Sequence, residues 1–152
     1  MALRVFDVAN YFLSRVDEEA GDAITNLHLQ KLVYYAQGFS LAFLEYPLFP
    51  ETIEAWQHGP AIPVLFEKYK EYGCKAIPVP KDFDFAVFSE DEKRLLNEIY
   101  EVYGSYSAWR LKEIVLNETP WKEAFERGDS EISLESMKEF FATQVELNGG
   151  LF

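Results

Sequence analysis

Cysteine and histidine are the side chains of this chain whose chemistry points most directly to catalysis. The sequence holds one cysteine, Cys74, and two histidines, His28 and His58. A thiol beside an imidazole is the arrangement of an activated nucleophile. Cys74, however, follows Gly73 in a predicted helix-ending turn, and the three residues lack the close spacing of a zinc site. We therefore predict no catalytic residue and no metal site, and expect no cofactor.

The motifs that usually accompany catalysis are also missing from the sequence. It contains no Gly-rich phosphate loop, no helix motif with paired histidines and no Gly-x-Ser-x-Gly elbow. Because enzymes exist without these motifs, a hydrolase that assembles its site around His58 and Cys74 stays open as an alternative. The prediction is a protein without enzymatic activity.

A second group of chemically informative side chains lies between residues 29 and 38. At 100° per residue, Gln30, Tyr34 and Gln37 share one stripe of a helix, and Lys31 lies on another. An unpaired buried amide costs roughly 1–3 kcal/mol. These groups are therefore expected either to form an internal hydrogen-bond network or to face a partner, and the sequence leaves both interpretations open.

The helix that carries these groups is nearly apolar on all of its faces. Such a helix belongs at the centre of a domain, and we expect it to cover about residues 26–44. Gly38 and Ala42 lie one turn apart on one face, where the lack of bulk favours the close crossing of another helix.

Other segments show weaker but consistent patterns. Helical spacing and capping residues predict six further helices. Five lie near residues 3–16, 63–73, 89–104, 107–115 and 133–148, and one begins with Thr119 as its N-cap and Pro120 as its first helical residue. Alternation predicts a short strand over residues 52–57, followed by a turn at His58, Gly59 and Pro60. The predicted fold is all-α or α-dominated (α+β), a compact multi-helix bundle around the central buried helix with a small β element. We expect one domain, residues 1–152, with a flexible tail at residues 148–152.

Composition restricts the partners. The chain has 26 acidic and 14 basic residues, a net charge of −12, which repels nucleic acid and anionic membranes. It has no apolar stretch long enough for a membrane span and no secretory segment after Met1, so we expect a cytoplasmic protein. Aromatic residues make up 16% of the chain, and Trp56 and Trp121 are interpreted either as packing anchors or as contact residues for a protein partner.

Three motifs, read together, resemble the Panacea-domain family, which includes phage-associated GepA-type proteins and SocA-like antitoxins. They are Leu29-Gln30-Lys31-Leu32-Val33-Tyr34-Tyr35-Ala36-Gln37-Gly38, Pro47-Leu48-Phe49, and Ile53-Glu54-Ala55-Trp56-Gln57-His58-Gly59-Pro60. The later segments Tyr103-Gly104, Ser107-Ala108 and Glu118-Thr119-Pro120-Trp121 follow in the same order and spacing. The resemblance extends from about Val5 to Phe141. Leu116 departs from the pattern, because members of the family often carry a histidine there.

The resemblance implies an antitoxin that neutralises a cognate protein toxin by direct binding. In the SocA-like branch it also implies an adaptor that delivers the toxin to a ClpX/ClpP-type protease. The alternative is a phage- or mobile-element-encoded protein that binds a host factor and has no toxin of its own.

We expect the partner to dock across the turn that follows the strand and the polar stripe of the central helix. The predicted partner-binding residues are Gln30, Lys31, Tyr34, Gln37, Trp56, His58, Gly59 and Pro60, and Gly38 and Trp121 are expected to be structural.

Overall fold

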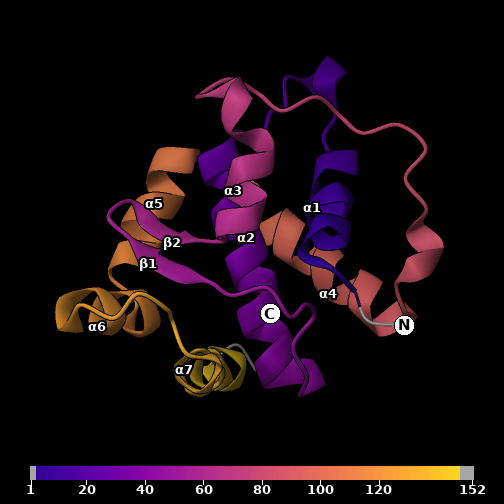
Figure 1. Ribbon diagram of the computed structural model, residues 1–152. Helices are drawn as coiled ribbons and strands as arrows, with labels where there is room; N and C mark the ends of the chain where they lie inside the picture. The colour runs from indigo at the N-terminus through magenta and orange to yellow at the C-terminus, as the bar shows by residue number, and fades with distance from the viewer. Residues whose placement is uncertain (1–2, 148–152) are drawn as a thin grey trace.

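One buried helix forms the axis of the molecule. The computed structural model describes residues 3–147, in which α2 spans Asn26–Phe39 and continues as a π-helical turn, η2, over Ser40–Leu44. Every residue of α2 except Leu27 is buried. Figure 1 shows α2 running through the middle, with the other elements around it. The predicted central helix at about residues 26–44 and the α-dominated fold are both confirmed.

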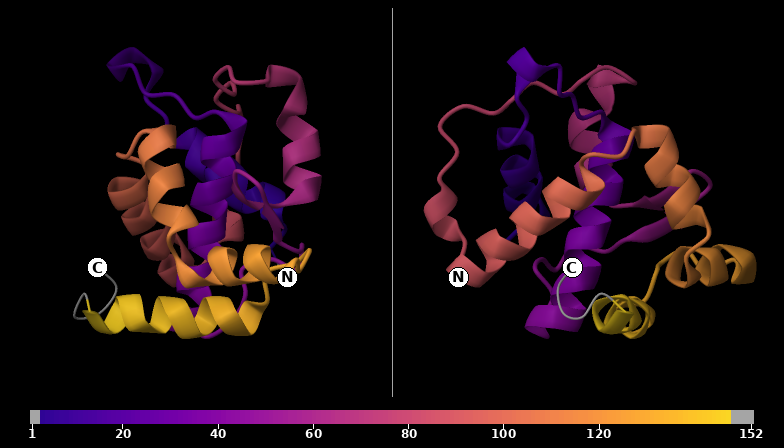
Figure 2. Two further views of the ribbon diagram at one scale, coloured as in Figure 1. Left: turned by 90° about the vertical axis from the view of Figure 1, so that its left-hand side faces the viewer. Right: turned by 180° about the vertical axis from the view of Figure 1, so that it is seen from behind.

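Five helices pack directly on α2, and a sixth closes one corner of the bundle. Helices α1, α3, α4, α5 and α7 contact α2, whereas α6 packs against α5, α7 and strand β1. Figure 2 shows α7 lying across the C-terminal end of the α2 axis. The six helices are α1 (Val5–Ser14), α3 (Pro63–Tyr69), α4 (Glu90–Tyr103), α5 (Ala108–Leu116), α6 (Thr119–Arg127) and α7 (Leu134–Leu147), and short 3-10 turns cover Glu18–Ala20, Lys70–Tyr72 and Phe85–Val87.

The small β element is a hairpin, and its turn lies one residue earlier than the sequence predicts. Strand β1 (Glu54–Trp56) pairs antiparallel with β2 (Gly59–Ala61), and Trp56 opposite Gly59 leaves Gln57 and His58 as the turn. Gly59 and Pro60 were expected in the turn but belong to β2. Ala55, which lies opposite Pro60, directs its N–H away from β2 and donates it to the carbonyl oxygen of Ser130 at 3.0 Å. Because this pair exchanges no ladder hydrogen bonds, the missing N–H of proline is tolerated.

Local capping fixes most helix starts. Ser89 and Glu92 form the expected capping box of α4, and the Ser107 hydroxyl caps α5. Helix α6 begins one residue early, with Glu118 and not Thr119 as its N-cap and Pro120 in its first turn.

The close helix crossing occurs at Gly38. A Cβ at this position would overlap the ring of Phe141, so the missing side chain lets α7 approach α2. Within residues 3–147, no helix combines the length and apolar character that crossing a bilayer requires. The tail at residues 148–152, expected to be flexible, lies outside the described residues.

Candidate functional site

The hairpin is held on the bundle by two tryptophans. Trp121 in α6 donates its indole N–H to the backbone oxygen of Trp56 at 2.7 Å, and the Trp56 indole N–H donates to Glu54 Oε1 at 2.8 Å. The Trp56 ring packs edge-on against Phe66 of α3 and the His58 imidazole, with centroid separations of 5.1 and 5.7 Å. Trp121 is buried and Trp56 is half-buried, so the first is an anchor and the second presents part of its ring.

The polar stripe of α2 forms internal hydrogen bonds. Gln30 Oε1 accepts the N–H of Ile62 at 2.8 Å, and its Nε2 donates to Asn26 Oδ1 at 2.9 Å. Gln37 likewise accepts the N–H of Leu48 at 2.7 Å and donates to the carbonyl oxygen of Phe49 at 2.9 Å. These two amides therefore tie the segments that follow α2 to its side, as the network interpretation expects.

Tyr34 and Tyr35 fill the centre of the core in different ways. The Tyr35 hydroxyl donates to Glu118 Oε1 at 2.8 Å, and its ring stacks on Tyr103 at 4.2 Å. The Tyr34 hydroxyl is buried without a hydrogen-bond partner among the described residues, and its ring packs edge-on against Phe141. Burial raises the pKa of both phenols well above the ordinary value, so both stay protonated.

Glu118 is the carboxyl group at the junction of α5 and α6. Burial raises the pKa of Glu118 to about 7, and the hydrogen bond from Tyr35 opposes this shift. The group therefore titrates near neutral pH. Its contact with Tyr35 connects the start of α6 to the central helix.

Lys31 is a buried ammonium group without a carboxylate partner in the described part of the chain. The residue is 2% exposed, and its Nζ donates to the carbonyl oxygen of Leu27 at 3.2 Å. Burial, and then the charge of Lys112, lower the pKa of Lys31 to about 8. Buried lysines are almost always paired, which makes this one unusual.

The hairpin turn lies over this lysine. A Cβ on Gly59, whose φ is +124°, would lie 3.4 Å from Lys31 Cε and 3.8 Å from its Nζ. The Nδ1 atom of His58 is buried without a hydrogen-bond partner in the described chain. Burial, and then the charges of Lys31 and Lys112, lower the pKa of His58. Lys31 of α2, His58 of the turn and Lys112 of α5 are thus close enough for their charges to act on one another.

Burial divides the eight residues predicted to contact a partner. Trp56 and His58 are partly exposed, whereas the other six, Gln30, Lys31, Tyr34, Gln37, Gly59 and Pro60, are buried. Gln37 and Tyr34 lie in the core beside Phe49 and Phe141, and Lys31 lies beneath Gly59 of the hairpin. Direct contact with a partner stays a prediction for all eight residues.

Trp109 is an exposed aromatic residue that the sequence analysis missed. Its 69% exposure is the largest among the exposed large hydrophobic residues of the described chain. It lies in the first turn of α5, three residues before Lys112, on the same face of the helix. Only knowledge of which face of α5 packs inward could have revealed it.

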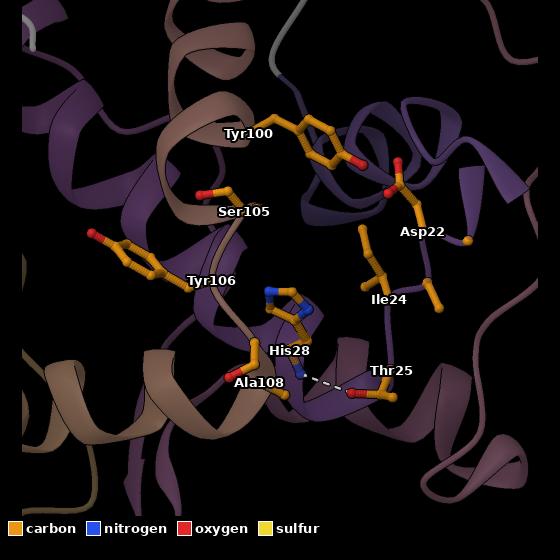
Figure 3. A pocket seen from close by; sticks show the side chains of 12 residues that line it. Asp22, Ile24, Thr25, His28, Tyr100, Ser105, Tyr106 and Ala108 are labelled. Carbon is orange, nitrogen blue, oxygen red and sulfur yellow. Dashed lines mark hydrogen bonds between the residues drawn. The ribbon is translucent and has the colours of Figure 1, made fainter.

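A polar cavity of about 350 Å³ lies at the N-terminal end of α2 (Figure 3). Asp22, Thr25, His28 and Tyr100 are among the residues that line it. The His28 backbone N–H donates to the Thr25 hydroxyl, which caps α2. Burial lowers the pKa of His28, although a hydrogen bond with the Tyr103 backbone opposes the shift, and the imidazole is neutral at pH 7.

The three residues that first suggested catalysis are distributed over separate elements. Cys74 is exposed beyond α3, His58 lies in the hairpin turn and His28 lies in the first turn of α2. No group of three metal-binding side chains is found within residues 3–147.

The structure defines a helical domain in which the polar side chains of the central helix form internal hydrogen bonds. The hairpin and α5 carry the partly exposed rings of Trp56 and His58 and the exposed ring of Trp109. The chain belongs to the family described as Antitoxin SocA-like, Panacea domain, whose model matches residues 29–122. These residues run from α2 to the start of α6.

One curated relative is the protein named Antitoxin SocA from Caulobacter vibrioides (strain NA1000 / CB15N). It is 43% identical over 54 residues, which are 36% of this chain and 29% of the relative. The aligned part therefore spans less than a third of the relative's length. No solved structure matches this chain.

Proposed function

We propose that this protein is an antitoxin that neutralises a cognate protein toxin by binding it directly, in the cytoplasm. The observation that carries this proposal is the family match over residues 29–122, supported by the likeness to a protein named as an antitoxin. The proposed activity requires no catalytic group.

The proposed binding face combines the hairpin turn with the exposed side of α5. Trp56 and His58 present partly exposed rings at the turn, and Trp109 presents most of its indole on α5. Tryptophan is enriched at the residues that dominate binding energy in protein interfaces. The stable core beneath the turn fits this role, because a preorganised surface loses less entropy on binding.

Co-expression tests the proposal. The neighbouring reading frame is expressed alone and together with this protein, and growth and co-purification are measured. The antitoxin function predicts that the neighbouring product is lethal alone, that growth is restored on co-expression, and that the two proteins purify as a complex. A neighbour that is harmless, or that stays lethal on co-expression, contradicts it.

The finer part of the proposal is delivery of the toxin to a ClpX/ClpP-type protease. In cells that contain this protein, the half-life of the toxin should shorten, and deletion of the unfoldase should restore it. Neutralisation with an unchanged toxin half-life would show blocking by binding instead. Capture of a host protein, with no toxic neighbour, would favour the alternative of a host-factor binder.

A further inference from the structure

The polar cavity at the N-terminal end of α2 contains a buried imidazole with one nitrogen that has no partner. His28 is 5% exposed and lines the cavity, and Figure 3 shows its ring among the side chains around this space. Its Nε2 atom forms no hydrogen bond within residues 3–147. A buried polar atom without a partner costs free energy, so its place beside a cavity points to a ligand.

The other nitrogen of His28 fixes the hydrogen-bonding role of Nε2. The hydrogen bond with the Tyr103 backbone raises the pKa of the imidazole, so the ring donates and the backbone oxygen accepts. Because Nε2 has no partner, the donor is Nδ1. In the neutral ring Nε2 is then an acceptor, and it requires an N–H or O–H group from the ligand.

The cavity has a buried floor and an exposed rim. Ile24 and His28 are buried, whereas the lining residues 21–23 and 105–107 are exposed. The volume of about 350 Å³ is in the range of sites for small ligands. A group that enters from solvent therefore meets the imidazole at the floor.

The charge of the lining favours a cation. Among the lining residues, Asp22 is the one with a full charge at pH 7, because the His28 imidazole is neutral. Asp22 forms no ion pair within residues 3–147, and its carboxylate accepts the N–H of Asp17 at 3.3 Å. Arg15 lies over the Tyr100 ring, but the carboxylates of Asp22 and Asp17 also act on the Tyr100 hydroxyl. Negative charge therefore predominates here.

The helix ends around the cavity do not reverse this preference. The N-termini of α2 and α5 meet the C-terminus of α4 here, through the lining residues Thr25, Ser107 and Gly104. A helix end corresponds to about half a unit charge, positive at the N-terminus and negative at the C-terminus. Two positive ends and one negative end leave about half a positive charge, which is less than the full negative charge of Asp22.

We propose that this cavity receives a positively charged nitrogen group, the side chain of a lysine or arginine on the protein partner. Its N–H groups donate to His28 Nε2, and its charge pairs with Asp22. The cavity adjoins the proposed binding face, because Ala108 in its lining directly precedes the exposed Trp109 of α5. The net charge of −12 attracts a partner that carries such groups. The inference rests on the proposed antitoxin function and specifies which kind of side chain the partner inserts.

The first test uses the isolated protein with methylammonium and methylguanidinium as probes. The chain has only two histidines, so the imidazole NMR signals of His28 report on the cavity and those of His58 are the internal control. At pH 8, at least one probe should shift the His28 signals and leave those of His58 unchanged. N-methylurea, which resembles methylguanidinium without its charge, should cause no shift. An unmoved His28 with both probes, or an equal response to N-methylurea, overturns the inference.

Asp22→Asn tests the charge in the same titration. Asparagine retains an oxygen that can accept the N–H of Asp17, so the variant changes little besides the charge. The shift of the His28 signals should fall to half or less. Asp82→Asn removes an equal charge from an exposed loop and should leave the shift as it is. An equal response of the two variants contradicts the pairing with Asp22.

The second test uses the toxin that the co-expression experiment identifies. Asp22→Asn and His28→Asn should each weaken co-purification of the toxin by tenfold or more, whereas Asp82→Asn should not. Asparagine at position 28 still offers an N–H to the Tyr103 carbonyl oxygen but lacks the Nε2 acceptor. Asp22 is exposed, so its variant should unfold at the temperature of the unmodified protein, which separates recognition from a structural role.

Failure of the inference and failure of the proposed function can be distinguished. Full capture of the toxin by both cavity variants overturns the insertion of a partner side chain and leaves the antitoxin function standing. A shift of His28 by the probes would then assign the cavity to a free organic cation. An unmodified protein that neither captures nor neutralises the neighbouring product overturns the function, and the probe titration then decides the cavity independently.

Discussion

At the scale of single residues, Glu118 holds its proton at pH values where an exposed glutamate has lost it. Its pKa is raised from the ordinary 4.5 to about 7 by burial, so folding favours the protonated form. The stability from this group is present below pH 4.5 and is lost as the pH rises through 7. Near neutral pH the carboxylate is therefore a cost to the fold.

Glu118→Gln is expected to remove this pH dependence. The glutamine amide stays neutral and its oxygen still accepts the Tyr35 hydroxyl, so the variant should be more stable at pH 8 by roughly 1–3 kcal/mol. Urea unfolding at pH 5 and pH 8 measures the difference. The matched control is Glu123→Gln, which changes an exposed carboxylate on α6. Equal pH dependence in the unmodified protein and the Glu118 variant would contradict the argument.

Gln37→Leu tests whether the polar stripe is structural. The substitution leaves the N–H of Leu48 and the carbonyl oxygen of Phe49 without their partner, which should cost roughly 2–5 kcal/mol in the free energy of unfolding. Gln144→Leu on α7, where the amide makes no buried hydrogen bond, provides the comparison. A stable Gln37 variant that fails to bind its partner would instead support the partner-facing interpretation.

At the scale of elements, the approach of α7 to α2 depends on the missing side chain of Gly38. Gly38→Ala places a methyl group inside the Phe141 ring, and we expect destabilisation of roughly 1–3 kcal/mol by overpacking. In the double variant with Phe141→Ala the two effects should be far from additive, because the smaller side chain accepts the new methyl group. Thermal unfolding of the four proteins measures this coupling, and strict additivity would exclude a direct contact.

Element boundaries were predictable where the determining contacts are local. The capping box of Ser89 and Glu92 lies within four residues, and the sequence places the start of α4 correctly. The hairpin turn was placed one residue late because glycine and proline usually mark turns, whereas here Gly59 and Pro60 pair with Trp56 and Ala55. The role of Gln30 could not be decided, since its acceptor oxygen pairs with Ile62, 32 residues away.

At the scale of the whole molecule, the net charge of −12 acts on any partner before contact. The central helix and the α-dominated fold followed from the apolar period of residues 29–38, whereas the covering of Lys31 by Gly59 did not, because the two residues meet only in the folded chain. The overall field of the acidic chain attracts a basic protein from a distance.

This attraction predicts that added salt slows association with the toxin. The association rate with the toxin should fall about tenfold or more between low salt and about 0.5 M salt, because screening shortens the range of the overall field. Trp109→Ala, on the proposed binding face, should raise the dissociation rate and change that salt dependence little. Stopped-flow mixing measures both rates, and an association rate independent of salt would contradict electrostatic attraction.

The three tryptophans differ in their contact with solvent, and this difference turns them into built-in optical reporters. Trp121 is buried, Trp56 is half-buried and Trp109 is mostly exposed. Indole emission moves to shorter wavelength as water leaves the ring, so most of the long-wavelength fluorescence of the free protein should come from α5. Binding of a partner to this face should therefore shift the tryptophan emission of the unlabelled protein to shorter wavelength.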